Sequence, residues 1–266
     1  MIPNLPKADV TPPPAVVEVA AGRPVRPVWV NEVGGLTFQV GDGTARQFVK
    51  WTPPDSGIDH SAEAARLAWA GAFTPVPQVL GQGADDTGSW LITAGLPGHS
   101  AVFDPWKGDP ATAVRAIGEG LRALHDTLPV GECPFSWSAR QRLTSAHARA
   151  AAGRIDPRNW HPDHRELTTV ELALDELADL PPTDELVVCH GDACAPNTLI
   201  GDDGRWCGHV DLGALGTADR WADLAIATWS TEWNYGPGWQ APLLDAYGIE
   251  ADPRRIRYYR LLWDLG

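Results

Sequence analysis

The hydrophobic pattern of this 266-residue chain changes once along its length, and that change is the strongest constraint on the fold. Up to about residue 93, short runs rich in β-branched and aromatic residues alternate with turn sequences, which is typical of an antiparallel sheet. Two of these runs, 36–40 and 47–51, flank the hairpin-like sequence GDGTAR. Beyond the turn-rich segment AGLPGHSA, apolar residues recur at helical spacing. The pattern predicts an α+β fold with two lobes.

The same pattern sets the expected boundaries. Residues 1–27 are rich in proline and alanine and predict a poorly ordered arm or an irregular edge. A small β lobe with one helix at 60–73 is expected over 28–93, a hinge over 94–98, and a larger, mainly helical lobe over 99–266. Within that lobe, helices are expected at 110–127, 139–152, 156–166 and 168–180 and from 221 onward, with short strands between 186 and 210.

Charge and cysteine content exclude several classes of protein. A net charge of -13 repels nucleic acid and anionic lipid, although it attracts a small cationic molecule. No segment has the basic and apolar regions of a secretion signal or the length of a membrane span. The four cysteines include no CxxC pair and indicate reduced thiols, since a zinc site would need irregular spacings. We expect a cytoplasmic protein, either a monomer or a weak dimer, with no nucleic-acid or membrane partner.

The segment 187–215 carries the clearest chemistry. A strand-like run ends in His190-Gly191-Asp192, Asn197 follows five residues after Asp192, and Asp211 follows the next hairpin. Carboxylate and amide oxygens suit Mg²⁺ that carries a nucleotide's phosphates, and a further carboxylate can orient an attacking hydroxyl. An isolated His-Gly-Asp would be interpreted as a strand-end turn with a capping aspartate. Together with Asn197 and Asp211, it indicates a kinase.

These motifs resemble the catalytic and metal-binding loops of the aminoglycoside phosphotransferase family, most closely its 3'-phosphotransferases, which have a protein-kinase-like fold. The resemblance implies that Asp192 is the catalytic base and that Asn197 and Asp211 are the Mg²⁺ ligands. His190 would support the loop, and a helical aspartate matching Asp223 would brace it. Asp219 fits a helix cap better.

The first lobe would then bind ATP or GTP. The resemblance implies that Lys50 holds the α- and β-phosphates, with Glu63 as its ion-pair partner. Gly34-Gly35 would cover the phosphates through backbone N–H groups. An exposed edge-strand lysine and a solvated helix glutamate are the alternatives for Lys50 and Glu63. The hinge would contact adenine through Thr93, Ala94 and Leu96, or serve only as a linker.

The acceptor site is implied mainly by the last residues, YYRLLWDLG, which resemble the C-terminus of the 3'-phosphotransferases. Acidic groups there bind the ammonium groups of the drug. The residues expected to contact the acceptor are Asp163, Glu232, Asn234, Asp264 and Gly266, the last through its carboxylate. Asp163 has the alternative of a solvated face, shared with Asp156 and Glu166.

One departure from the family pattern concerns the metal loop. The 3'-phosphotransferases usually read Asp-x-Gly-Arg, whereas this chain has Asp211-Leu212-Gly213-Ala214. Arg220 is the nearest residue that could replace the arginine. The expected reaction is γ-phosphoryl transfer to an aminoglycoside hydroxyl, the 3'-hydroxyl by resemblance, giving antibiotic resistance. The alternatives are a kinase of another small alcohol, such as a macrolide, homoserine or choline, and a non-catalytic nucleotide-binding relative.

Overall fold

The protein is described by a computed structural model that covers residues 10–31 and 34–266. Its contacts divide the chain into two compact units. The first contains the chain up to Ala113 together with Pro196–Gly213, and the second contains Val114–Ala195 and Ala214–Gly266. Residues 196–213 therefore belong to a unit that is otherwise built from the first part of the chain.

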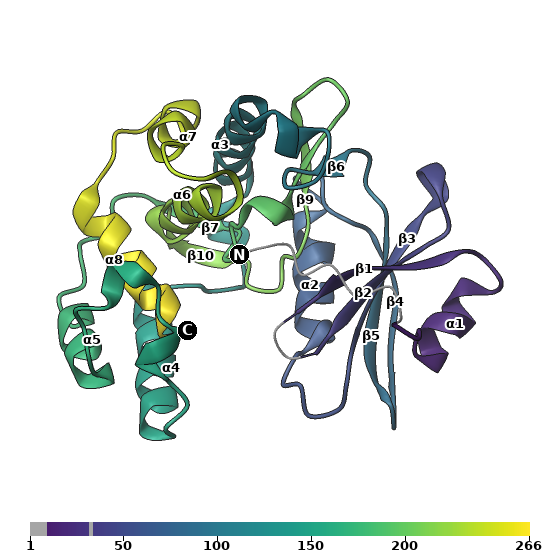
Figure 1. Cartoon of the computed structure of the whole chain (residues 1–266), viewed down its shortest axis with the longest axis horizontal. Helices are drawn as coiled ribbons and strands as arrows, with labels where there is room; N and C mark the ends of the chain where they lie inside the picture. Colours follow the sequence, from purple (N-terminus) through teal and green to yellow (C-terminus); the bar gives the residue numbers. More distant parts are fainter. Residues whose placement is uncertain (1–9, 32–33) are drawn as a thin grey trace. The chain divides into compact units, whose positions relative to one another are not determined.

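A five-stranded antiparallel sheet forms the centre of the first unit (Figure 1). The expected hairpin is present, because residues 36–40 pair antiparallel with 47–51 on either side of GDGTAR. The expected first strand begins earlier than predicted, and its residues 32–33 lie outside the described residues. The strands, in the spatial order β1-β2-β3-β5-β4, are β1 (Val25–Val30), β2 (Leu36–Val40), β3 (Gln47–Thr52), β5 (Gly88–Ala94) and β4 (Val79–Asp85).

The two faces of this sheet carry different helices (Figure 1). On one face, Phe38 and Val49 pack with Val16 of helix α1 (Pro14–Ala20). On the other, helix α2 (His60–Ala70) contacts β4 and β5. Successive side chains of a strand alternate between faces, so Lys50 points away from the side on which its neighbour Val49 lies. The expectation of an irregular arm is wrong for residues 14–20 and 25–27, which form α1 and the start of β1.

A second, three-stranded sheet completes the first unit. Strand β6 (His99–Ser100) pairs with β8 (Thr198–Ile200), and β8 pairs with β9 (Trp206–His209). The amide of Ala101 donates to the Thr198 carbonyl at 3.0 Å, and the Ser100 hydroxyl donates to the Pro196 carbonyl at 2.8 Å. These bonds hold the late segment 196–213 against residues that precede it by about a hundred positions.

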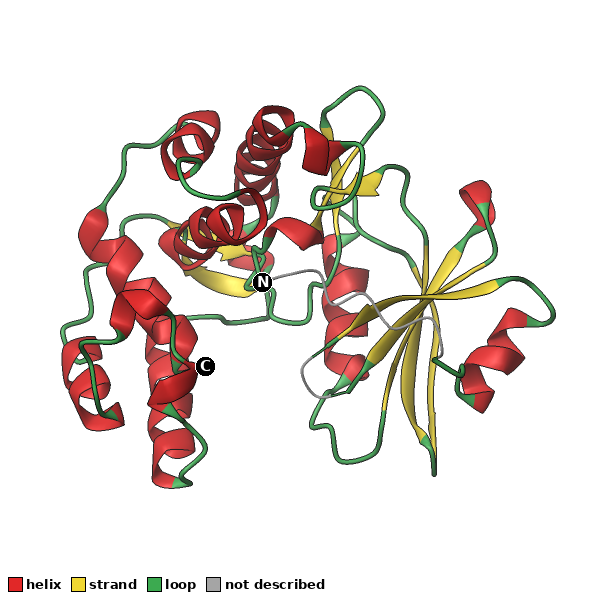
Figure 2. Ribbon diagram, in the orientation of Figure 1, coloured by secondary structure: helices red, strands yellow, loops and turns green. Residues whose placement is uncertain are grey.

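Helices make up most of the second unit (Figure 2). Helix α6 is its core, since every residue from Trp221 to Thr231 is buried. Helices α7 and α8 pack on α6, and α8 also contacts α4 and α5. The elements are α3 (Pro110–Thr127), whose first turn lies in the first unit, α4 (Ala139–Ala151), α5 (Val170–Leu177), α6 (Trp221–Tyr235), α7 (Gln240–Tyr247), α8 (Pro253–Asp264) and the antiparallel pair β7 (Leu186–Cys189) and β10 (Gly216–Asp219).

The helix expected at 110–127 has those bounds, whereas the helix expected at 156–166 is absent. That segment forms two short 3₁₀ turns, Pro157–Asn159 and Pro162–His164. Each begins with a proline that follows a side-chain cap, so the second proline ends any helix started by the first. Among the described residues, no helix combines the length and apolar character needed to cross a bilayer.

Candidate active site

The first unit contains a cavity of about 490 Å³ beside the face of its sheet that carries Lys50. Side chains from β2, β3, α2, the linker after β5 and the returning segment 196–213 line it. Seven of the predicted site residues are among them: Lys50, Glu63, Thr93, Ala94, Leu96, Asn197 and Asp211. Residues separated by up to 161 positions in sequence are therefore gathered around one space.

Lys50 is the centre of a charged cluster in this cavity. Its ammonium nitrogen lies 2.6 Å from a Glu63 oxygen and 2.9 Å from an Asp211 oxygen. Burial alone would lower the pKa of Lys50, but the charges of Asp211 and Glu63 outweigh that effect and raise it. Lys50 is therefore a permanent cation at physiological pH. The alternative that Lys50 is an exposed lysine on an edge strand is therefore wrong, because β3 lies inside the sheet and the ammonium is paired.

Asp211 and Asn197 come from the two ends of the β8–β9 hairpin. The Val210 amide donates to the Asn197 carbonyl at 3.0 Å, which closes the hairpin beside both side chains. Asp211 has a φ of 66°, a left-handed conformation that is uncommon for a residue other than glycine. Its side chain remains 48% exposed, whereas that of Glu63 is 9% exposed. The accessible carboxylate of the cluster is thus that of Asp211.

The linker at one side of the cavity is held by Arg46, a residue that no sequence motif singles out. The Arg46 guanidinium donates to the carbonyls of Leu96 and Gly98, and the Gly95 amide donates to the Arg46 carbonyl at 2.9 Å. A Cβ on Gly95 would lie 2.6 Å from Cγ of Arg46, so this approach requires glycine. Arg46 also lines the cavity.

Gly34 and Gly35 form the turn between β1 and β2, as expected, with Gly34 at a φ of 79°. The Gly35 amide donates to the Asn31 side chain at 2.6 Å. The described residues that line the cavity do not include either glycine. The structure therefore assigns the turn to these glycines and leaves their contact with phosphate as a prediction.

In the second unit, Asp223 lies beneath the loop that carries Asp192. The fully buried Asp223 carboxylate accepts hydrogen bonds from the amides of His190 and Gly191 at 2.6 and 2.9 Å. Burial alone would raise the pKa of Asp223, but the hydrogen bond from His125, helped by that from the Gly191 amide, lowers it. Asp223 is an anion that binds the two peptide groups preceding Asp192. His125, which donates to it, is another residue that the sequence reasoning missed.

The chain after Asp211 also packs closely on this loop. Gly191 has a φ of 85°, and a Cβ there would lie 2.2 Å from the carbonyl oxygen of Ala214. Ala214, which stands where the family has its arginine, thus lies against Gly191, the residue before Asp192.

Arg220, the residue expected to replace that arginine, instead donates to Asp184 at 2.8 Å and pairs with Glu185 at 2.5 Å. Its guanidinium is therefore already paired with acidic residues in the segment before β7. The N-cap of α6 is Arg220 and not Asp219 as expected, but the Asp219 carboxylate, one residue earlier, accepts from the Trp221 amide at 2.9 Å.

An aromatic cluster adjoins the Asp192 loop. The Cys194 side chain is buried with Ile226 and Trp229, and the half-buried Trp233 and Trp263 pack against them. Burial raises the pKa of the Cys194 thiol well above its ordinary value, and the neighbouring Asp192 carboxylate raises it further. Cys194 is therefore a neutral thiol beside Asp192, as expected for a small buried residue.

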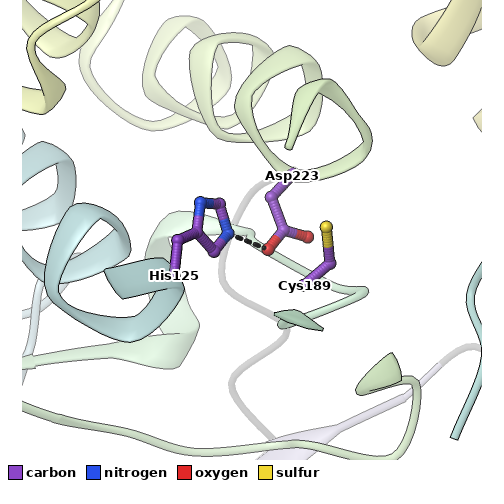
Figure 3. Close-up of side chains that lie close together, drawn as sticks. All are labelled: His125, Cys189 and Asp223. Carbon is purple, nitrogen blue, oxygen red and sulfur yellow. Dashed lines mark hydrogen bonds and ion pairs between the residues drawn. The ribbon is translucent and has the colours of Figure 1, made fainter. Parts of the chain in front are cut away.

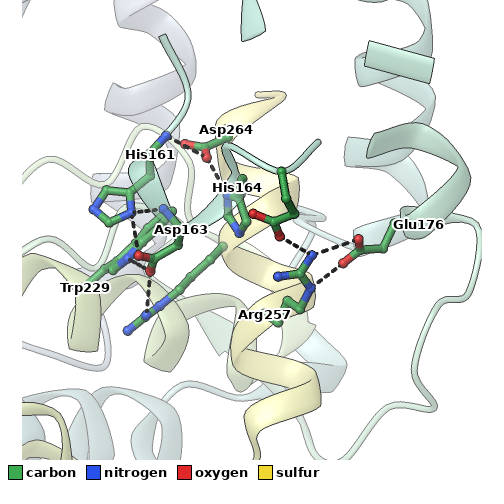
Figure 4. A network of polar contacts seen from close by, with 9 residues as sticks. His161, Asp163, His164, Glu176, Trp229, Arg257 and Asp264 are labelled. Carbon is green, nitrogen blue, oxygen red and sulfur yellow. Dashed lines mark hydrogen bonds and ion pairs between the residues drawn. The ribbon is translucent and has the colours of Figure 1, made fainter. Parts of the chain in front are cut away.

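Two of the acidic residues expected to contact the acceptor, Asp163 and Asp264, belong to a polar network around Trp229 (Figure 4). The Asp264 carboxylate, 10% exposed, accepts from the His164 side chain at 2.6 Å and from the His161 amide at 3.0 Å. Asp163 is 48% exposed and accepts from the Trp229 indole at 3.1 Å. Asp264 thus joins α8 to the 161–164 segment, while Asp163 is the more accessible acid.

The remaining expected acceptor residues lie in or beyond the ends of α6 and α8. The Asn234 amide donates to the Ser230 carbonyl at 2.8 Å, so one of its donors is already used. Glu232 is half-buried, and its charge faces that of Arg260. Gly266 is exposed. Asp156 and Glu166 pair with Arg158 and Arg257, as expected of a solvated face.

Comparisons with known proteins agree with this geometry. Residues 31–259 match the model of a phosphotransferase enzyme family. An aminoglycoside 3'-phosphotransferase of Streptomyces fradiae is 36% identical over 219 residues, which cover 79% of this chain and 81% of that protein. A streptomycin 3''-kinase of Streptomyces griseus is 32% identical over 244 residues, covering 87% and 88%.

The fold is also found among solved structures. The crystal structure of an aminoglycoside 3'-phosphotransferase of type VIII superposes with a TM-score of 0.79 at 29% identity, covering 95% of this chain and 98% of that one. The family match spans most of the chain, including the Lys50 cluster and the Asp192 loop. The protein is therefore a member of the phosphotransferase enzyme family, whose enzymes transfer phosphoryl groups to hydroxyl groups.

Proposed function

We propose that this enzyme transfers the γ-phosphoryl group of ATP or GTP to a hydroxyl of an aminoglycoside, and that the 3'-hydroxyl is the acceptor. The observation that carries the proposal is the cluster of Lys50, Glu63 and Asp211 in a cavity that also contains the linker residues. Its relatives named as aminoglycoside 3'-phosphotransferases support the acceptor class and position. The physiological consequence would be antibiotic resistance.

The proposed nucleotide contacts follow from the opposite charges of the phosphates and Lys50. A nucleoside triphosphate brings several negative charges into the cavity, and Lys50 is the cation that would meet its α- and β-phosphates. Glu63 would keep the lysine side chain extended, because it is the less exposed of its two partners. Thr93, Ala94 and Leu96 would contact the base, and Gly34 and Gly35 would cover the phosphates. ATP and GTP remain alternatives.

The donor chemistry of Asp211 and Asn197 fits Mg²⁺, because a carboxylate and an amide oxygen line the same cavity. Asp211 is also the exposed carboxylate of the Lys50 cluster, so a cation that carries phosphate can reach it. We propose these two residues as its ligands. When bound, Mg²⁺ would neutralise part of the charge on the phosphates.

Asp192 is proposed as the residue that orients the acceptor hydroxyl and accepts its proton. Asp223 would fix the direction of Asp192 by binding the two preceding peptide groups. The transferred phosphoryl group needs little covalent chemistry from the protein, so accurate placement of these groups supplies most of the catalysis.

The acceptor would be a small cationic molecule, which the net charge of -13 favours over nucleic acid or anionic lipid. Asp163, Glu232, Asn234, Asp264 and the Gly266 carboxylate are the proposed contacts. Asp163 is more accessible to an ammonium group than Asp264, since it is 48% exposed against 10%, although it already contacts Arg260 and the Trp229 indole. We propose that the enzyme acts in the cytoplasm as a monomer or weak dimer.

The test is a coupled assay of nucleoside diphosphate release, followed by mass spectrometry of the product. Kanamycin should be phosphorylated. Tobramycin, which lacks the 3'-hydroxyl but retains the ammonium groups, should inhibit competitively without gaining phosphate. If tobramycin gains phosphate as readily as kanamycin, the 3' position is wrong and the phosphotransferase activity stands.

A second candidate is a streptomycin 3''-kinase, favoured by the relative with that name, which matches 87% of the chain. Streptomycin in the same assay distinguishes it. Macrolides, homoserine and choline test the remaining small alcohols. A protein that binds nucleotide but releases no diphosphate with any acceptor would be the non-catalytic relative.

A further inference from the structure

A chain of hydrogen bonds in the second unit connects helix α7 to the loop that carries Asp192. The Tyr247 hydroxyl lies 2.9 Å from Nδ1 of His125, and Nε2 of His125 lies 3.0 Å from an Asp223 oxygen. Figure 3 shows the imidazole aimed at the carboxylate. All three residues are buried, and they come from three different helices, α7, α3 and α6.

The chain continues from Asp223 into the backbone of the loop. The oxygen that faces His125 also accepts from the His190 amide at 2.6 Å, and the other oxygen accepts from the Gly191 amide at 2.9 Å. A fully buried carboxylate is stable only when such donors replace its water. The imidazole is therefore one of three donors that fix where this carboxylate lies.

The bond to Asp223 also defines which ring nitrogen acts as its donor. Because a carboxylate can only accept, Nε2 carries the proton that is donated to Asp223. Nδ1 lies within hydrogen-bond distance of the Tyr247 hydroxyl, which can serve as donor or acceptor. Asp223 and Tyr247 therefore hold the ring at its two nitrogens.

The same place offers an alternative interpretation as a metal site, because atoms of His125, Cys189 and Asp223 lie within 4.8 Å of one another. Two facts favour the hydrogen-bonded interpretation. The Asp223 oxygens already accept three N–H groups, and the Cys189 thiol donates to the Asp219 carbonyl at 3.4 Å. Burial raises the pKa of Cys189 well above its ordinary value, so this thiol stays protonated.

We infer that His125 is a positioning residue for phosphoryl transfer, which holds Asp223 so that the peptide groups of His190 and Gly191 aim Asp192 at the acceptor. The catalytic part of this inference rests on the proposed role of Asp192. No sequence motif points to it, because His125 lies 65 positions before His190 and 98 positions before Asp223.

Two amide substitutions separate the functions of the two ring nitrogens. The side-chain nitrogen of glutamine occupies the place of Nε2, so His125→Gln keeps a donor for Asp223. The side-chain nitrogen of asparagine occupies the place of Nδ1, so His125→Asn leaves Asp223 without that donor. We expect His125→Gln to keep kcat within about 3-fold of wild type and His125→Asn to lower it by about 10- to 100-fold, with nucleotide Kd unchanged in both.

Tyr258→Phe serves as the matched control. Tyr258 is a buried tyrosine of the same unit, and its hydroxyl donates to the Leu177 carbonyl at 3.2 Å, away from Asp223. This substitution removes a buried hydrogen bond and lowers Tm, yet it should leave kcat unchanged. A loss of kcat in His125→Asn that exceeds the loss in Tyr258→Phe at similar Tm supports positioning.

Amide hydrogen exchange at His190 and Gly191 gives a readout that needs no acceptor. Faster exchange in His125→Asn than in His125→Gln supports the inference, and equal exchange overturns it. Equal kcat in the two variants overturns it as well. If wild type phosphorylates no acceptor, the proposed function fails, and the exchange comparison alone then decides whether His125 positions the loop.

Discussion

Asp211 and Lys50 form an ion pair of 2.9 Å in which the carboxylate is half exposed and the ammonium is largely covered. The second partner of Lys50, Glu63, is nearly buried and lies at 2.6 Å. The two carboxylates that pair with Lys50 therefore differ in their exposure to solvent. On the proposed function, a nucleotide that enters the cavity would displace the exposed Asp211 from the lysine while Glu63 kept its contact. This asymmetry distinguishes the covered partner of the lysine, Glu63, from the accessible partner, Asp211, which we propose as a cation ligand.

Replacing Asp211 tests that distinction. Asp211→Ala should abolish the Mg²⁺-dependent stabilisation by nucleotide, because it removes a carboxylate from a site with few ligands. Thermal unfolding with and without ATP and Mg²⁺ measures the effect. Asp42→Ala is the control, since Asp42 lines the same cavity but pairs with Arg26. Nucleotide stabilisation of Asp211→Ala to the wild-type extent would contradict the assignment.

Substitution of Asp192 should separate turnover from binding. We expect Asp192→Ala to lower kcat by about 100-fold or more while the nucleotide Kd stays near the wild-type value, because a general base acts mainly in the transition state. Steady-state kinetics and calorimetric titration give the two quantities. An equal loss in nucleotide affinity would refute the proposed role.

Arg46 is expected to affect nucleotide binding through the linker. Arg46→Ala removes the donors to the Leu96 and Gly98 carbonyls, so it should raise the nucleotide KM by about 3- to 10-fold with little change in kcat. Arg46→Lys should rescue only part of the loss, since one ammonium group lacks the planar fork that spans two carbonyls. An unchanged KM in Arg46→Ala would show that the linker keeps its conformation without this side chain.

The lowered pKa of Asp223 predicts how its contribution to stability depends on pH. The folded state favours the carboxylate, so the stabilisation is present above the unfolded pKa of about 3.9 and is lost as pH falls through the folded value. The difference in urea midpoint between wild type and Asp223→Asn should therefore be largest near pH 7 and shrink below about pH 4. A difference that is constant from pH 7 to pH 3 would mean that the charge contributes no stability.

Much of the fold follows from local pattern. The helix at 110–127 has the expected bounds because its apolar residues recur along one face, which is enough to define an amphipathic helix. Helix α1 was missed because it has seven residues, and its stability depends on Val16 packing against the sheet. An isolated helix of that length is not stable, so composition alone cannot reveal it.

The same difference between what local sequence pattern predicts and what tertiary contacts determine applies to the candidate site. Asn197 and Asp211 were found because their residue types and spacing suit phosphate chemistry, Lys50 was found through the family resemblance, and all three line one cavity. Arg46 and His125 were not found, since each acts through partners that only the tertiary structure supplies. For Asp264, the sequence indicated an acid near the end of the chain, but it could not indicate that His164, a hundred residues earlier, binds that acid.

The return of residues 196–213 to the first unit has a consequence for synthesis and folding. Asn197 and Asp211 emerge from the ribosome long after the five-stranded sheet has been translated, so the cavity lacks both residues until most of the chain is made. A fragment that ends at Ala113 would lack two of the three strands of the sheet β6-β8-β9, namely the central strand β8 and the outer strand β9. On the proposed function, nucleotide would therefore stabilise the folded first unit only after residue 211 of the 266 has been made.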